Sequence, residues 1–287
     1  MGRWRAAGVT EGRIAHYPST MLRMVPSPCL RHREEDDMNA PLPTRRDEAW
    51  RYADLKALEP VWPKMDGPEH INVPAGETVS RQIAELPVID GVGMVNLDVT
   101  IGDKATFILH VLAHNADYGR IQVKATLGNG SHFELGGAIL GSGKQTLEIV
   151  TETIHAEPNA TSNQVVRSVL ADTATGSFLG SINVARHAQK TDAAQSVKSM
   201  LLDRGATANA KPELEIFADD VKCAHGATVG ELDKQALFYL ASRGLPPVEA
   251  KKLMLQAFIA DAFVSLDDDA ARDEIEGKAL AVLEALS

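Results

Sequence analysis

Two short stretches of the sequence repeat each other at a spacing of 31 residues. QVVRSVLAD (164–172) and QSVKSMLLD (195–203) match at Gln, Val, Arg or Lys, Ser, Leu and Asp. Such an echo is typical of stacked coils, in which each coil buries an apolar face that it cannot bury alone. The echo favours a solenoid or β-helix, and a β-sandwich remains the alternative because two copies are few for a repeat array.

The residues around the echo alternate between apolar and polar side chains. In RIQVKATLGNG (120–130), apolar side chains occupy every second position before a Gly-Asn-Gly turn. Similar short runs recur from about Val95 to Thr228, and no long amphipathic pattern interrupts them, which counts against alternating strands and helices. We therefore predict a mainly β core over residues 95–228.

Helical patterns flank this core. PTRRDEAWRYADLKAL (43–58) predicts an amino-terminal helix that begins with a capping-box-like pair, Thr44 and Asp47. VEAKKLMLQAFIADAF (248–263) predicts a helix, and its run LMLQAFIADAF (253–263) is apolar on nearly all sides, as expected for a helix that is deeply buried or has a second partner. We therefore divide the chain into a segment 1–37, an N-terminal helical region with a connector (38–94), the β core (95–228) and a C-terminal helical region (229–287).

Residues 1–37 differ in composition from the rest of the chain. They are rich in Arg and contain no continuous apolar run of the secretory type. We interpret them as a disordered extension, or as the product of an upstream start with Met38 as the natural start. An organelle transit peptide is the alternative, and the acidic run 34–37 argues against it.

Composition limits the classes of function. The formal net charge of −10 disfavours nucleic acid as the main partner. No window approaches the ~18 consecutive apolar residues of a membrane span, so no membrane partner is expected. Two cysteines far apart in 287 residues do not make a disulfide framework, which favours a cytoplasmic protein.

One stretch resembles a phosphate-binding loop but differs from the motif at two of its defining positions. AILGSGKQT (138–146) has Ala138 where the first Gly of such a loop should be and Gln145 where a hydroxyl should bind Mg²⁺. We expect a Gly-rich turn between two strands. His110 and His114 have the spacing of a helical metal pair but lie in a strand-prone run with no third ligand, which predicts structural or surface histidines.

The stretch ADDVKCAHGATVG (218–230) contains two candidate metal ligands, half the number that a four-coordinate site requires. Cys223 and His225 are two positions apart and project from the same side of an extended strand. If the register of the preceding strand persists, they face away from its core, beside Glu213 and Glu215. A thiolate and an imidazole suit iron, zinc or a cluster, but they cannot close a four-coordinate site. Either the Cys is buried beside a hydrogen-bonded His, or another chain or the substrate supplies further ligands.

Longer stretches around this pair resemble a known family. PELEIFADDVKCAHGATVGELDKQALFYLASRG (212–244) resembles the signature region of the SufB/SufD family, scaffold subunits of the Suf iron–sulfur cluster assembly system. HAQKTDAAQSVKSMLLDRGATANAKPELEI (187–216) and PTRRDEAWRYADL (43–55) resemble the preceding β-helix coil of the family and the amino-terminal helix of SufD. The presence of only Cys29 and Cys223 points to SufD within the family. The resemblance implies a right-handed parallel β-helix between an N-terminal helix and a C-terminal helical region.

The resemblance also implies a non-catalytic scaffold subunit of a SufB–SufC–SufD complex. SufB would pair with the β-helix, and a transient iron–sulfur cluster would form at the junction, where His225 falls on the family's histidine and Cys223 has a secondary role. The C-terminal helices would dock the SufC ATPase, with Met254 and Phe258 as candidate contacts. The resemblance is compatible with a homodimer of the isolated chain and implies no tightly bound cofactor in this chain alone. The alternative is an independent metal-dependent enzyme that uses His110, His114, Cys223 or His225.

Overall fold

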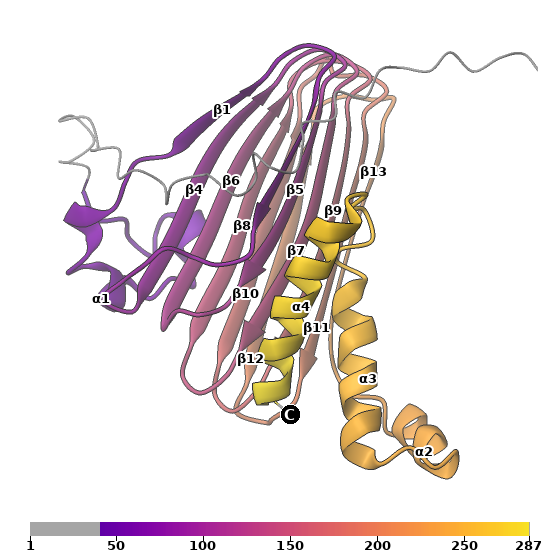
Figure 1. Cartoon of the computed structure of the whole chain (residues 1–287). Helices are drawn as coiled ribbons and strands as arrows, with labels where there is room; N and C mark the ends of the chain where they lie inside the picture. Colours follow the sequence, from indigo (N-terminus) through magenta and orange to yellow (C-terminus); the bar gives the residue numbers. More distant parts are fainter. Residues whose placement is uncertain (1–40, 287) are drawn as a thin grey trace, which may run out of the picture.

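The structure is a computed structural model that describes residues 41–286, so the predicted segment 1–37 lies outside the described residues. The chain alternates between two mainly parallel sheets that stack into a solenoid of about six turns (Figure 1). One sheet has the strand order β1-β4-β6-β8-β10-β12, with β3 antiparallel to β4, and the other has the order β2-β5-β7-β9-β11-β13. The elements are η2 (Glu48–Trp50), α1 (Leu55–Leu58), η3 (Trp62–Lys64), β1 (Glu69–Val73), β2 (Thr78–Ile83), β3 (Val88–Ile89), β4 (Val92–Ile101), β5 (Thr106–Ala113), β6 (Tyr118–Leu127), β7 (His132–Gly141), β8 (Thr146–His155), β9 (Thr161–Leu170), β10 (Thr175–Val184), β11 (Asp192–Leu201), β12 (Thr207–Ile216), β13 (Lys222–Glu231), α2 (Lys234–Ser242), α3 (Pro247–Ala260) and α4 (Asp269–Leu286).

The sequence echo corresponds to two neighbouring coils in register. Gln195 pairs with Gln164, and Lys198 pairs with Arg167, in the parallel ladder between β11 and β9. The solenoid prediction is confirmed, and the β-sandwich alternative is wrong because sandwich sheets are antiparallel. Paired strands begin at Glu69, well before Val95, where the sequence pattern first becomes strand-like.

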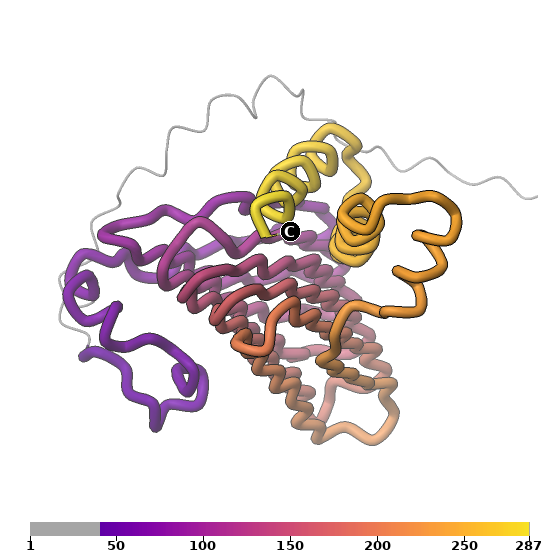
Figure 2. Tube along the Cα trace, turned by 90° about the horizontal axis from the view of Figure 1, so that it is seen from below, coloured from indigo at the N-terminus to yellow at the C-terminus, as the bar shows by residue number. Residues whose placement is uncertain are grey.

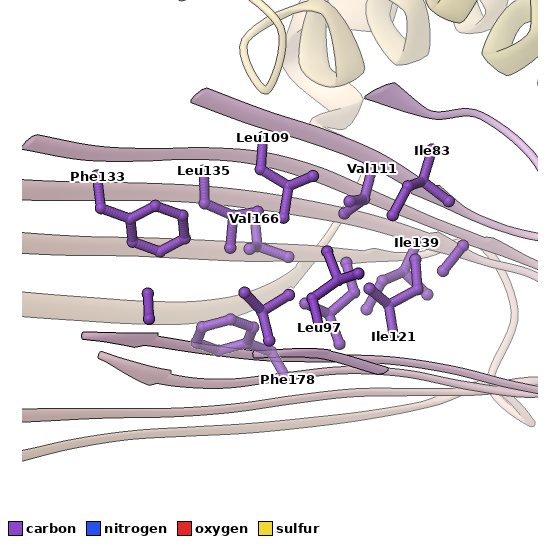
Figure 3. Packing of buried hydrophobic residues seen from close by; sticks show 14 of the residues in the cluster. Ile83, Leu97, Leu109, Val111, Ile121, Phe133, Leu135, Ile139, Val166 and Phe178 are labelled. Atoms are coloured by element: carbon purple, nitrogen blue, oxygen red, sulfur yellow. The ribbon is translucent and has the colours of Figure 1, made fainter. Parts of the chain in front are cut away.

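Apolar side chains from both sheets fill the interior of the solenoid (Figure 3). Phe107 and Phe133 occupy equivalent positions of neighbouring coils, and their rings stack with centroids 6.1 Å apart. Alternate residues of each strand point inward, so the period of two in the sequence becomes one continuous core. The labelled members of this core are Ile83, Leu97, Leu109, Val111, Ile121, Phe133, Leu135, Ile139, Val166 and Phe178.

One corner of the coil requires a left-handed backbone in successive turns. Lys104 (φ 55°), Gly130 (φ 64°), Asn159 (φ 63°) and Lys190 (φ 65°) occupy this corner. The amide of Lys190 donates to the carbonyl oxygen of Asp220 in the next coil over 2.7 Å, and the other three corners make the same kind of bond. Gly and Asn adopt this conformation readily, whereas Lys does so only rarely.

The stretch that imitates a phosphate-binding loop is a turn between β7 and β8, as expected. The side chain of Gln145 accepts a hydrogen bond from the Ser142 amide over 3.0 Å and donates one to the Ala116 carbonyl over 3.0 Å. Gln145 therefore closes its own turn and fastens it to the preceding coil. No helix follows this turn, so its amides do not form a phosphate cradle of the P-loop kind.

The helix expected over 43–58 is interrupted. The Thr44 amide donates to the Asp47 carboxylate over 2.9 Å, which is part of the expected capping interaction. The chain then forms only the 3-10 helix η2 and the four-residue α1. The Asp54 carboxylate accepts from the Ala57 amide over 3.1 Å, so α1 begins with its own cap rather than continuing the earlier turn.

Arg120 on β6 holds this amino-terminal segment on the outer face of its sheet. Its guanidinium is fully buried, donates to the Ala49 carbonyl oxygen over 2.8 Å and lies 3.8 Å from the centre of the Trp50 ring. It also donates over 2.8 Å to the Glu148 carboxylate, which accepts a second bond from the Tyr118 hydroxyl. Arg120 therefore joins β6 and β8 to the segment that covers them.

Helices α3 and α4 cover the outer face of the opposite sheet (Figures 1 and 2). Leu255, Ile259 and Phe263 form one buried cluster with Leu112 and Leu140 of the strands beneath them. Helix α2 stands away from the sheets, and none of its residues is buried. No helix within residues 41–286 is long and apolar enough to cross a membrane.

The corner between α3 and α4 fits closely onto the sheet. A Cβ atom built on Gly136 of β7 would lie 2.0 Å from the carbonyl oxygen of Ala262, so only glycine leaves room for this corner. Arg167 of β9 donates to the Asp261 carboxylate over 2.8 Å and is itself almost fully buried. The helices are thus held by shape at one strand and by an ion pair at the next.

Candidate functional site

Cys223 and His225 lie on β13, the last strand of its sheet. β13 pairs only with β11, in a register that places Cys223 beside Ala193 and His225 beside Gln195. Because alternate residues of a strand share a side, Cys223 and His225 project in the same direction. The sequence prediction that they share one face of a strand is thus consistent with the register.

The direction that they face differs from the expected one. Cys223 packs against an inner cluster that includes Ile182, Val184 and Ala193, so it faces the interior and does not lie on the outer side with Glu213 and Glu215. The chain turns a corner between β12 and β13 and enters the other sheet, so the alternation of β12 does not continue into β13. The predicted outward orientation is therefore wrong.

The two candidate ligands have different environments. The Cys223 side chain is half-buried, and burial raises the pKa of its thiol, with the negative charge of Asp192 adding to the effect. A protonated thiol is a poor metal ligand and a poor nucleophile. His225 is exposed at the same end of the solenoid. The imidazole is therefore the better prepared ligand of the two.

The last coil, formed by β12 and β13, has no neighbouring coil of residues 41–286 on its far side, and we call this surface the bare end. β12 and β13 each pair with one neighbour only, and most of their residues are exposed. Three large apolar side chains are exposed there: Ile216, Phe217 (57 % of its surface) and Val229. Unpaired strand edges with apolar side chains are templates for another chain. The end that carries His225 therefore has the character of an interface.

His110 and His114 do not join this site. They belong to β5 and the turn after it, and β7, β9 and β11 separate β5 from β13. His110 lies 3.0 Å from the Ser265 hydroxyl, and His114 lies 3.0 Å from the Ala84 carbonyl oxygen. Both are structural histidines, as expected. Among residues 41–286, no group of three or more His, Cys, Asp or Glu side chains could hold a metal ion.

The C-terminal helices expose apolar side chains on the side away from the sheets. Phe238 of α2 is 77 % exposed, and Leu253 of α3 is 50 % exposed. Met254 and Phe258, the contacts named from the sequence, are only half-buried, and Phe258 also packs against the cluster beneath α3. Leu253 is therefore a cleaner probe of this outer surface than either of them.

Sequence reasoning missed a set of polar side chains inside the solenoid. Gln164 is fully buried and hydrogen-bonds the hydroxyls of Thr151 and Thr153, at 2.8 and 3.0 Å. His155 is also fully buried and lies 2.9 Å from the Ser162 hydroxyl. Gln195 is buried one coil further on, beneath His225. The echo contained the signal, because both copies begin with Gln.

The described residues thus form a parallel β-solenoid with helices on its flanks and an exposed imidazole at its bare end. The SufBD core domain of the SUF system for FeS cluster assembly matches residues 90–258. This match covers more than half of the chain and includes the solenoid from β4 onward, with the bare end. The chain therefore belongs to the SufBD family of iron–sulfur cluster assembly proteins.

Within this family the chain is most like SufD. It is 39 % identical over 121 residues to the iron–sulfur cluster assembly protein SufD of Escherichia coli K12, which is 42 % of this chain and 29 % of the relative. It is 30 % identical over 148 residues to SufD of Bacillus subtilis 168, covering 52 % of this chain and 34 % of that protein. Protein ABCI7, chloroplastic, of Arabidopsis thaliana is 34 % identical over 139 residues, covering 47 % and 29 %. The chain thus spans about a third of the length of these relatives.

Proposed function

We propose that this chain is a non-catalytic, SufD-like scaffold subunit of an iron–sulfur cluster assembly complex. The observation that carries the proposal is the bare last coil, which presents unpaired strand edges, exposed apolar side chains and His225 together. Membership of the SufBD family, whose domain is described as part of FeS cluster assembly, supports cluster chemistry at this end. A single exposed imidazole needs ligands from a second chain before it can hold a cluster.

The partner proposed for the bare end is SufB. A second β-solenoid that continues the two sheets would cover the exposed strand edges of β12 and β13, and apolar contacts at Phe217 and Val229 would add to the binding. A transient iron–sulfur cluster would form at this junction as cargo. In this role His225 supplies a ligand or a proton relay, and Cys223 is secondary because its thiol retains its proton.

The partner proposed for the C-terminal helices is the SufC ATPase. Phe238 of α2 and Leu253 of α3 are two of the large apolar side chains that these helices expose, together with Tyr239 and Val248. Large apolar side chains at the centre of an interface contribute most of its binding energy. Leu253→Glu should therefore abolish capture of SufC and leave both SufB pairing and the melting temperature unchanged.

Co-expression of the full chain with SufB and SufC, followed by anaerobic purification, tests the proposal. The expected result is a complex of all three proteins that contains iron and acid-labile sulfide. His225→Ala should leave the subunit composition intact and remove most of the iron and sulfide, whereas Cys223→Ala should have a mild effect. A full chain that captures neither partner would contradict the scaffold role. A normal iron content in the His225→Ala complex would contradict only the site assignment.

A further inference from the structure

Gln195 is the side chain directly beneath His225 in the interior of the solenoid. The ladder between β11 and β13 pairs the two residues, and neighbouring strands lie about 4.8 Å apart, so residues paired in this way stack on the same side. The Gln195 side chain is 3 % exposed, yet neither its amide nitrogen nor its amide oxygen has a hydrogen-bond partner among residues 41–286. Buried amides are almost always hydrogen-bonded, so this one calls for an explanation.

The equivalent residue one coil earlier shows what Gln195 lacks. Gln164 is held by Thr151 and Thr153 of β8. In the register between β8 and β10, these two threonines are replaced by Gly180 and Ile182 at the level of Gln195. Neither replacement has a side-chain hydroxyl. The sequence therefore places two threonine hydroxyls beside Gln164, whereas at the same two positions beside Gln195 it places residues without a hydroxyl.

Gly180 leaves room for the amide of Gln195 and for the ring of Phe178. A Cβ atom built on Gly180 would lie 2.5 Å from the Phe178 ring and 2.6 Å from the Gln195 amide nitrogen. In the following coil, the residue paired with Gln195 along the same inward column is His225. The unpartnered amide of Gln195 thus lies between Gly180 of the other sheet and His225 on the neighbouring strand of its own sheet.

We propose that Gln195 is a positioning residue for His225. In the described conformation the two side chains are not hydrogen-bonded. A rotation of the imidazole toward the interior would let the Gln195 amide oxygen accept a hydrogen bond from one ring N–H, which would fix a single tautomer. The other ring nitrogen then carries a free lone pair and faces the open end of the solenoid. Metal-binding histidines commonly have this arrangement, in which the second ring nitrogen is held by a neighbouring acceptor. Its importance for cluster formation rests on the function proposed above, whereas the hydrogen bond itself does not.

The tautomer of His225 can be measured in the isolated full chain. The ring nitrogens of ¹⁵N-labelled histidine are observed in mildly alkaline buffer, at about pH 8.5. The His225 signals are assigned by their loss in His225→Ala. We expect two well-separated ring nitrogen shifts in the wild type, and a shift toward the average of a free histidine in Gln195→Met. Gln195→Glu, which keeps an acceptor oxygen, should preserve the separation.

Gln164→Met is the matched control, because it removes the same amide one coil further inside. It should lower the melting temperature, since it leaves two threonine hydroxyls without their partner, and it should not change the His225 tautomer. A wild-type spectrum equal to that of a folded Gln195→Met variant would overturn the proposal. A lost tautomer preference with a normal iron and sulfide content in the SufB–SufC complex would support the positioning and contradict the proposed role of His225.

Discussion

At the scale of single residues, Arg120 is the largest side chain that the structure buries completely. It is tolerated because each side of the guanidinium has a partner: a carboxylate, a carbonyl oxygen and an indole ring. A buried charge that loses one partner keeps its desolvation cost without the compensating attraction. Arg120 therefore connects the stability of the solenoid to the position of the amino-terminal segment.

Arg120→Met should lower the free energy of unfolding by about 3–5 kcal/mol, because it leaves the Glu148 carboxylate buried and without its cation. Urea denaturation of the full chain measures this loss. Arg81→Met is the control, because Arg81 pairs with Glu69 at the surface, where such a pair contributes about 0–1 kcal/mol. Equal losses in the two variants would show that burial does not determine the contribution of Arg120.

Two buried histidines predict a pH dependence of stability. Burial lowers the pKa of both His110 and His155 from 6.5 to about 4. Between these values the unfolded chain binds protons that the folded chain does not, so stability is full above the unfolded pKa and falls as the pH decreases toward 4. Each histidine contributes up to about 1.4 kcal/mol per pH unit in this window. The loss ends once the folded protein also takes up the proton.

The double variant His110→Gln, His155→Gln should show a flatter dependence of the urea midpoint on pH between 4 and 6.5. His187→Gln is the matched control, because the His187 side chain is 65 % exposed. It should retain the wild-type slope. An unchanged slope in the double variant would mean that other groups govern the acid sensitivity.

The sequence identified Cys223 and His225 because their residue types and spacing are visible without a structure. Their inward orientation was not predictable, since it depends on a corner between β12 and β13 that resets the alternation of side chains. Gln195 was visible as part of the echo. Its missing partners were not, because they depend on Gly180 and Ile182 of the other sheet, and only the register aligns these with the threonines of β8.

At the scale of elements, the attachment of α3 and α4 depends on one glycine. Gly136→Ala places a methyl group where the Ala262 carbonyl oxygen lies, so either the helix corner or β7 must move. We expect a loss of about 1–3 kcal/mol, as for an overpacked core, with faster proteolysis of the C-terminal helices. Limited proteolysis and thermal unfolding measure the two effects.

Gly230→Ala is the control for this prediction. An added Cβ atom at Gly230 meets nothing within 4 Å, and the residue also lies in a strand. Its stability should be within about 0.5 kcal/mol of the wild type, as for an ordinary surface substitution. Equal proteolysis of the helices in both glycine variants would contradict the close fit inferred at Gly136.

The strands were predictable because a period of two persists through each of them, and the echo even contained their register. The amino-terminal helix was predicted too long. Its first turn has the expected capping interaction, but Asp54 begins a new helix and Arg120 takes the Ala49 carbonyl oxygen as a partner. Tertiary contacts of this kind lie outside any local pattern.

At the scale of the whole molecule, the end of the solenoid formed by β12 and β13 exposes strand edges together with large apolar side chains. Isolated copies should therefore associate through the end formed by β12 and β13, where Phe217 and Val229 are exposed. Sedimentation velocity over a range of concentrations should show a reversible dimer. Val229→Glu should shift the chain to a monomer by placing like charges opposite each other.

Val88→Glu is the control for self-association, because Val88 is also an exposed valine in a strand but lies in β3, near the opposite end of the stack. Its dimer should persist. A wild-type chain that remains monomeric at every concentration, or a dimer equally weakened by both substitutions, would contradict association through the last coil.

The bare end also determines the order in which the solenoid opens. In a stack of coils, each inner coil is stabilised by two neighbours, whereas the last coil has a single one. Amide hydrogens of β12 and β13 should therefore exchange with solvent before those of β8 and β9, as fraying proceeds inward from this end. A docked solenoid turns the terminal coil into an interior one, so partner binding would be recorded as slowed exchange over several coils.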